Sequence, residues 1–366
     1  MEHLRNFINS IRSLLLDQFD PNEPIDPLKI DEVITICEPV LPNPLSQEER
    51  EHVIFTIHSQ FTIDLQHKGT VLGNPDVKRW LDNAKTEIEW TYWRAYRDYL
   101  ASDQGRAERI IEENERIIDN ILDYSGDPRI EGSWSRKGLV MGNVQSGKTQ
   151  NYLGLINKAM DAGYKIIILL GGHMNDLRKQ TQERVDEGLL GRKSRHLIQT
   201  TAGRAEPIGV GVFGVEDVGS GTTTLSDFNK HAKNVAGMSL TGHNPTIFTI
   251  KKNTNVMNNL YEWIRDHHRL DPTNGFKLEV PMMLIDDEAD YASINTKHHK
   301  EEITKTNEYI RSLLSLFKRN TYIGYTATPF ANIFIDPDDN AFSTEDDLFP
   351  SDFMIKIPVP DDYLGQ

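Results

Sequence analysis

The sequence contains little cysteine, no long hydrophobic run and no surplus of basic residues. Cys37 is the only cysteine among 366 residues, which excludes an intramolecular disulfide and a thiolate metal cluster. No apolar run reaches the roughly 18 residues that a membrane-spanning helix needs. The first residues, Met1 to Arg5, have neither the basic nor the apolar region of a secretory signal. These absences predict a cytoplasmic protein without a membrane partner.

The charge balance restricts the kind of nucleic-acid contact that is possible. The formal net charge is −15, from 40 Lys and Arg against 55 Asp and Glu. A protein that coats nucleic acid electrostatically usually carries a basic surplus. Any contact with nucleic acid is therefore expected in a local basic groove, as in a motor protein with a small footprint.

The first 129 residues are expected to form a mainly helical amino-terminal region. Between Glu108 and Tyr124, apolar residues recur at helical spacing with polar and charged residues between them. Gly126 and Pro128 then end the helix. An aromatic cluster lies upstream and has two interpretations, a core that packs helices together, which is favoured, or a surface for a partner or for bases. Its members are Trp90, Tyr92, Trp93, Tyr96 and Tyr99.

From residue 130 onward, short apolar runs alternate with amphipathic stretches. This pattern is typical of a parallel sheet covered by helices, and continuous apolar runs suit strands that are buried on both faces. Residues 190–245 are rich in Gly, Ser and Thr, so they form either an insertion or a region with a further strand. The expected strands are Gly138–Met141, Lys165–Leu170, Thr246–Ile250, Met282–Ile285 and Thr321–Tyr325.

A phosphate-binding motif follows the first of these strands. The pattern G-x-x-x-x-G-K-[ST] is met at every defined position by Gly142-Asn143-Val144-Gln145-Ser146-Gly147-Lys148-Thr149. A strand leads in and a helix over 148–162 leads out, which is the context that the motif requires. The glycines let backbone N–H groups face phosphates at the positive end of the helix dipole.

The motif assigns separate roles to its last residues. Lys148 is expected to reach the β- and γ-phosphates of ATP, and Thr149 is expected to bind Mg²⁺. The residues expected to bind ATP are Gly142, Val144, Gln145, Ser146, Gly147, Lys148, Thr149 and Gln150.

Carboxylates follow the fourth expected strand, in the order Asp286-Asp287-Glu288-Ala289-Asp290. An Asp at the carboxyl end of a buried strand can hold Mg²⁺, and the adjacent Glu can orient and deprotonate the attacking water. The tetrad from Asp287 to Asp290 favours Asp287 as the metal residue and Glu288 as the base. Asp286 competes for the metal role on sequence alone.

Two hydroxyls end the fifth expected strand, in Tyr325-Thr326-Ala327-Thr328-Pro329. Thr326 and Thr328 are expected to hydrogen-bond the carboxylates after Ile285 and to couple the nucleotide state to the rest of the molecule.

Polar and basic residues follow two other strands and are candidates for a nucleic-acid contact. Such side chains, together with helix N-termini, suit a nucleic-acid backbone. A charged helix face without a ligand is the other interpretation. The candidates are His173, Asn175, Arg178, Lys251 and Lys252.

In this order, the segments resemble the Z1 domain family, a branch of the superfamily 2 helicase-like ATPases. The resemblance covers about residues 130–366. It rests on Gly138 to Thr149, Ala162-Gly163-Tyr164-Lys165, Leu177-Arg178-Lys179-Gln180-Thr181-Gln182, Lys251-Lys252-Asn253, Leu284 to Asp290, and Gly324 to Asn332.

The resemblance implies a fold, an activity and partners. The fold is an α/β RecA-like P-loop sandwich, with a parallel sheet and helices on both faces, over residues 130–366, preceded by the helical region 1–129. The activity is that of a Mg²⁺-dependent ATPase that translocates on or remodels nucleic acid, namely double-stranded DNA, in bacterial defence against phage and other foreign DNA. Such proteins occur in operons with MORC-type ATPases, methyltransferases and restriction-like nucleases, so a MORC-type ATPase or a nuclease is an expected partner protein.

A complete motor of this type has a second lobe that supplies arginine fingers. No second array of strands and helices is expected after Pro329. We therefore expect an amino-terminal portion of a longer protein, truncated within its Z1 domain and weakly active alone. The alternative function is an ATP-controlled protein-binding switch, in which hydrolysis acts as a timer.

Overall fold

The computed structural model describes most of the chain. The described residues are 2–18, 27–41, 44–46, 49–50, 53–54, 57, 71–74, 76–142, 147–197, 206–215, 217–232, 238–267, 277–289, 300–327, 348 and 350–358.

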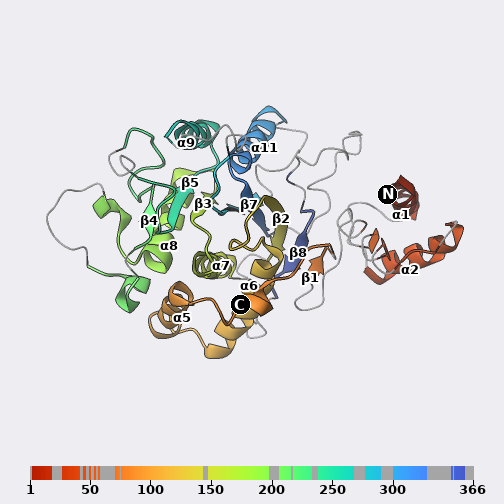
Figure 1. Cartoon of the computed structure of the whole chain (residues 1–366), viewed down its shortest axis with the longest axis horizontal. Helices are drawn as coiled ribbons and strands as arrows, with labels where there is room; N and C mark the ends of the chain where they lie inside the picture. Colours follow the sequence, from red (N-terminus) through yellow and green to blue (C-terminus); the bar gives the residue numbers. More distant parts are fainter. Residues whose placement is uncertain are drawn as a thin grey trace.

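A sheet forms the centre of the molecule (Figure 1). Its strands in the described residues are β1 (Val71–Gly73), β2 (Trp134–Met141), β3 (Ile166–Gly171), β4 (Gly219–Ser220), β5 (Thr246–Ile250), β6 (Met282–Asp287), β7 (Arg319–Thr326) and β8 (Phe353–Lys356). Their order across the sheet is β1-β8-β2-β7-β6-β3-β5-β4. All neighbours run parallel except β1, which pairs antiparallel with β8 at the edge.

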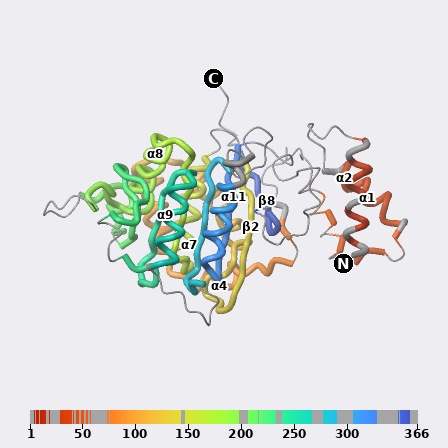
Figure 2. The backbone as a smooth tube through the Cα atoms, turned by 90° about the horizontal axis from the view of Figure 1, so that it is seen from above, coloured from red at the N-terminus to blue at the C-terminus, as the bar shows by residue number. Residues whose placement is uncertain are grey.

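Helices cover both faces of this sheet. The longer helices in the described residues, whether or not they cover the sheet, are α1 (Glu2–Gln18), α2 (Pro27–Cys37), α5 (Thr91–Ser102), α6 (Glu108–Tyr124), α7 (Lys148–Ala162), α8 (Asn175–Val185), α9 (Thr254–His267) and α11 (Lys300–Ser315). The shorter ones are η1 (Glu38–Val40), α4 (Leu81–Ala84), η2 (Asp186–Leu190), η3 (Ser194–Leu197) and η4 (Gly209–Phe213). In Figure 1, α5, α6 and α7 lie on one side of the strands and α9 and α11 on the other, and Figure 2 shows α9 and α11 running side by side.

Strand alternation divides the apolar residues of the central strands between a core on each face of the sheet. A third cluster contains residues of α1 and α2 together with Leu139 and Met141 of β2. Ile167 and Leu169 of β3 join the core under α5, α6 and α7, whereas Ile166 and Ile168 join the core under α9 and α11. Successive side chains of a strand point to opposite faces, so a strand that is covered on both sides has to be apolar throughout. The expected fold class, a RecA-like parallel sandwich, is confirmed.

The five expected strands are all present, with ends that differ by a few residues. The short strands β1 and β8 were not expected, whereas β4 is the further strand that one of the two interpretations of residues 190–245 allowed. β4 lies in the Gly-, Ser- and Thr-rich region, which therefore contributes an edge strand as well as loops. β8 follows residue 330 and pairs with the phosphate-loop strand β2, from Gly138↔Phe353 to Met141↔Lys356.

The helices α4, α5 and α6, which precede residue 130, do not pack as a separate body. Residues of α4, α5 and α6 share one core with α7 and with the sheet. Trp93, Tyr96 and Tyr99 are buried there, so the core interpretation of the aromatic cluster is confirmed for these three. Residue 129 marks a change of secondary structure and not a boundary in the packing. In the part of the chain that the structure describes, no helix is long and apolar enough to cross a membrane.

Asp161 attaches α5 to α7. Its carboxylate accepts hydrogen bonds from the backbone N–H groups of Tyr92 (2.9 Å) and Trp93 (2.8 Å), in the first turn of α5. These N–H groups have no partner within their own helix, so an acceptor from α7 satisfies them. Burial raises the pKa of Asp161 from 3.8 to about 6, although the backbone N–H groups act in the opposite direction.

We expect Asp161→Asn to change how stability depends on pH. Because the folded state holds the pKa above its unfolded value, ionisation costs wild-type stability as the pH rises from about 4 to about 6. The variant has no carboxyl group to ionise at this position. Its free energy of unfolding, relative to that of the wild type, should therefore increase by up to about 3 kcal/mol across that pH window. Urea unfolding from pH 4 to pH 7 measures this, and a difference that stays constant with pH would contradict it.

Candidate active site

The segments that carry the motifs meet at the carboxyl edge of the sheet. Strand β7 lies between β2 and β6, with Met141 opposite Thr326 and Asp287 opposite Tyr325. On the other side of β6, Gly171 lies opposite Asp287. In open parallel sheets, ligands bind at this edge, beside the point where the strand order reverses.

The phosphate-loop motif is described at both of its ends. Gly142 donates its backbone N–H to the carbonyl of Thr326 at 3.0 Å, and Lys148 Nζ donates to the carbonyl of Gly142 at 2.7 Å. Gly147 precedes α7 with a φ of 78°, and a Cβ at this position would meet no atom of the described residues within 4 Å. Residues 143–146, and with them the expected ATP contacts of Val144, Gln145 and Ser146, lie outside the described residues.

Thr149, in the first turn of α7, faces groups from other elements. Its Oγ1 accepts a hydrogen bond from Arg184 of α8 at 3.0 Å. Burial raises the pKa of the Tyr152 hydroxyl, the charge of Asp287 raises it further, and Thr149 and Arg184 lower it. The Thr149 hydroxyl and the Asp287 carboxylate therefore both lie close to Tyr152.

Asp286 is fully occupied as a structural residue. Its Oδ1 lies 2.6 Å from Lys252 Nζ, both side chains have an exposed fraction of 0%, and Oδ2 accepts a hydrogen bond from the Tyr322 hydroxyl at 3.1 Å. A carboxylate enclosed in this way has no room for a metal ion. Asp286 is thereby removed as a candidate for the metal role, and Asp287 is the candidate that remains.

Asp287 ends β6 on the opposite face and is partly exposed. Burial raises the pKa of Asp287. The positive charges of Lys252 and Lys148 lower it, and the negative charges of Glu288 and Asp286 raise it. The positive charge of Lys148 is thus near enough to this carboxylate to act on its pKa.

Glu288 has an unusual backbone. Its φ of 57° lies in the left-handed region, and it is the one non-glycine residue with positive φ in the described part of the chain. Such conformations cost of order 1–3 kcal/mol and persist where surrounding contacts impose them. Lys252 Nζ donates to the Glu288 carbonyl, and the Glu288 N–H donates to Asp287 Oδ1 at 3.1 Å. The turn directs the exposed carboxylate toward Gly172, where a Cβ would lie 3.7 Å from Oε2.

The described residues fit a Mg²⁺ ion that is bound together with a nucleotide, and not one that is held by protein side chains alone. They contain no group of three or more His, Cys, Asp and Glu side chains that could hold a metal ion. A Mg²⁺ held with a nucleotide needs only one or two protein oxygens, because phosphates and waters complete its shell. The Thr149 hydroxyl and the Asp287 carboxylate fit that requirement, and the space beside Gly147 that holds no atom of the described residues fits a phosphate.

Of the expected coupling residues, Thr326 is described and Thr328 is not. Thr326 is buried, and its carbonyl receives the N–H of Gly142, so the end of β7 is tied to the start of the phosphate loop. Gly324, two residues earlier, leaves room for the turn after β6, because a Cβ there would approach Ala289 Cβ to 3.0 Å.

Two of the five nucleic-acid candidates are buried, which contradicts their assignment to a nucleic-acid surface. Lys252 is enclosed with Asp286. The Arg178 side chain, 5% exposed, donates to the Thr223 carbonyl at 3.0 Å and lies 3.9 Å from Asp227. Both basic residues therefore serve the packing of the segments around β5 and cannot reach a ligand at the surface.

The other three candidates remain at the surface near one another. Lys251 Nζ donates to Asn175 Oδ1 at 3.0 Å, which joins the loop after β5 to the start of α8. His173 precedes α8 in the same loop as Gly172 and is partly exposed. This places a small polar surface beside Glu288.

The chain matches no protein-family model, and no curated protein matches it in sequence. The resemblance to the Z1 domain family therefore stays a prediction.

Three residues of the site were not assigned to it by the sequence. Tyr152 and Arg184 look like an ordinary core and an ordinary surface residue of their helices, and nothing in their spacing connects them with Thr149. Gly172 follows a strand as one of two glycines, and its positive φ of 72° is the one property that a sequence pattern could have indicated.

We expect Lys252→Met to destabilise the protein by about 3–5 kcal/mol, because it leaves the Asp286 carboxylate buried without its counter-ion. The neighbouring Lys251→Met should change the free energy of unfolding by less than about 0.5 kcal/mol, since Lys251 is at the surface. Denaturant unfolding of both variants checks this. Equal stability of the two would contradict the structural role of Lys252.

Proposed function

We propose that this chain is the ATP-binding lobe of a Mg²⁺-dependent, helicase-like ATPase. The observation that carries this proposal is the meeting of three motifs at one sheet edge, with Lys148 acting electrostatically on Asp287 while Asp286 is removed by its buried pair with Lys252. In this arrangement Asp287 remains as the carboxylate for a metal ion, and Glu288 remains as the carboxylate for the attacking water.

Each residue has a role in this proposal. Backbone groups at Gly147 and Gln150 and the amine of Lys148 would bind the phosphates, and Thr149 and Asp287 would hold Mg²⁺, which neutralises charge on the phosphates when bound. Glu288 would accept a proton from the attacking water as the bond between the γ-phosphorus and its bridging oxygen breaks. Thr326, tied to Gly142, would transmit the change at the phosphate loop to β7.

The family and the biological role belong to the same proposal. The motif order supports membership in the Z1 branch of superfamily 2, with action on double-stranded DNA in bacterial defence, a cytoplasmic location, and a MORC-type ATPase or a nuclease as partner. Lys251, Asn175 and His173 are the described residues that remain available for the DNA backbone.

A second function is favoured by the charge of the molecule. The net charge is −15, and the burial of Arg178 and Lys252 removes two of the expected basic contacts. These facts support an ATP-controlled switch that binds a partner protein. A motor requires that double-stranded DNA stimulate ATP turnover, whereas turnover of a switch responds to the partner protein and not to DNA.

Lys148→Ala should abolish ATP binding, because it removes the charge-assisted contact to the phosphates. Lys318→Ala is the matched control, since Lys318 pairs with Glu279 at the opposite edge of the sheet. Isothermal titration of the full chain with ATP and Mg²⁺ measures both affinities. Retained affinity in Lys148→Ala would refute the nucleotide site.

Glu288→Gln should lower ATP turnover by about 100-fold or more while leaving ATP affinity unchanged, because the amide cannot accept the proton. Glu279→Gln makes the same chemical change at the opposite edge and should turn over like the wild type. Phosphate release and ATP affinity are measured on both variants. Wild-type turnover in Glu288→Gln would show that Glu288 is not the base.

A further inference from the structure

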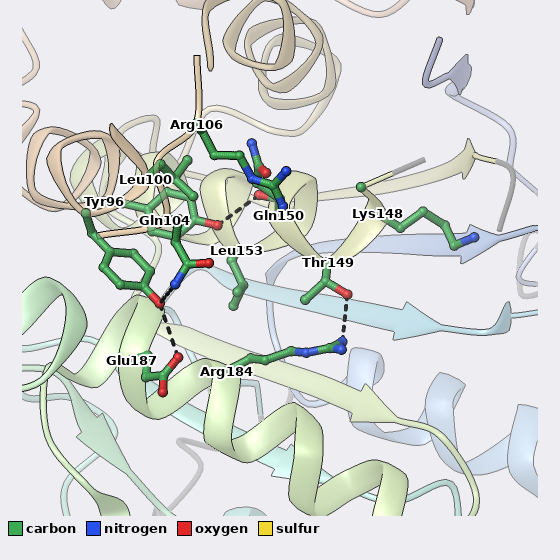
Figure 3. A pocket seen from close by; sticks show the side chains of 12 residues that line it. Tyr96, Leu100, Gln104, Arg106, Lys148, Thr149, Gln150, Leu153, Arg184 and Glu187 are labelled. Carbon is green, nitrogen blue, oxygen red and sulfur yellow. Dashed lines mark hydrogen bonds between the residues drawn. The ribbon is translucent and has the colours of Figure 1, made fainter. Parts of the chain in front are cut away.

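A cavity of about 550 Å³ opens beside the start of α7, between α7, α5 and the end of α8 (Figure 3). Its volume is in the range of small-molecule sites. One wall consists of Gly147, Lys148 and Thr149 at the phosphate loop, with Arg184 opposite them. The other wall comes from the helical region before residue 130, and it is not part of any motif.

That second wall is an ordered polar surface. Gln104 Nε2 donates to the Tyr99 hydroxyl at 3.0 Å, and the Tyr99 hydroxyl donates to Glu187 Oε2 at 3.1 Å. Tyr96 donates its hydroxyl to the carbonyl of Gln150, one residue after Thr149, at 3.2 Å. Contacts from α5 therefore reach both the first turn of α7 and the turn after α8, and they hold the Gln104 amide in the cavity.

The position of the cavity indicates which end of a nucleotide it receives. Asp287 and Glu288 are not among the described residues that line the cavity. In Figure 3, the side chain of Lys148 points away from Tyr96 and Gln104. A triphosphate whose terminal phosphate lies toward the carboxylates has its nucleoside on the other side of the phosphate loop, and the cavity is the space that opens there.

The side chains at that end suit a base and a ribose. An amide such as that of Gln104 offers a donor and an acceptor, which is the pairing that adenine presents with N6 and N7. The exposed guanidinium of Arg106 can stack on a base or donate to ribose oxygens. Tyr96 and Leu100, which are almost fully buried, form the floor of the cavity beside them.

We propose that the segment from Tyr96 to Arg106 forms the nucleoside subsite, with Gln104 and Arg106 as the residues that select adenine, an inference that rests on the proposed function. The helical region before residue 130 is then a wall of the nucleotide site. Because α5 is attached to α7 through Asp161 and Gln150, bound nucleotide bridges this region and the phosphate loop.

The test compares ATP with inorganic tripolyphosphate, which lacks a nucleoside, as ligands of the full chain in isothermal titration. Gln104→Ala and Arg106→Ala should each weaken ATP binding about tenfold, the effect of losing one hydrogen bond or stacking contact, and leave tripolyphosphate affinity unchanged. Arg109→Ala, on the exposed face of α6, is the control and should bind both ligands like the wild type.

Each outcome is decisive. Unchanged ATP affinity in both variants overturns the subsite, and so does an equal loss for ATP and tripolyphosphate, because the residues would then act on phosphates. Gln104→Glu keeps the size of the side chain and should reduce the ratio by which the protein binds ATP more tightly than GTP. An unchanged ratio overturns the role of Gln104 in selecting adenine. If the wild type binds neither ligand, the proposed function itself fails, which is distinct from a failure of the subsite.

Discussion

The buried ion pair between Lys252 and Asp286 is the interaction on which the site depends. Two buried charges are tolerated only when each is paired with the other, and here the lysine also donates a hydrogen bond to the carbonyl of Glu288. One ammonium group thus joins the loop after β5, the end of β6 and the left-handed turn that follows it. With Asp286 held inside, alternation along β6 directs Asp287 to the other face, and the turn places Glu288 beside Gly172.

Much of the fold could be predicted because buried parallel strands and phosphate loops have strong local patterns. Strands β2, β3, β5, β6 and β7 each contain a short apolar run, and each was located within a few residues. The roles of Lys252 and Arg178 could not be predicted, because their partners Asp286 and Asp227 are distant in sequence. A lysine after a strand looks the same whether it faces solvent or a buried carboxylate, and only the folded chain distinguishes the two.

The aromatic cluster shows the same limit in another form. It was interpreted as a core that packs helices together, and Trp93, Tyr96 and Tyr99 are indeed buried. The sequence held no information about which helix these residues pack against, which proved to be α7. The bond from Tyr96 to Gln150 spans 54 positions in sequence, so the wall that α5 gives to the cavity appears only when both helices are in place.

The core shared by α4, α5, α6, α7 and the sheet also restricts how such a protein can change in evolution. An amino-terminal helical region that shared no core with the sheet could be lost, exchanged or fused to another protein without destabilising the rest of the chain. Here the apolar face of α7 is covered by α5 and α6, so a chain that began at residue 130 would expose that face to water. Helices before the phosphate loop and strands after it are therefore expected to be inherited together, as one unit, even where their sequences diverge at different rates.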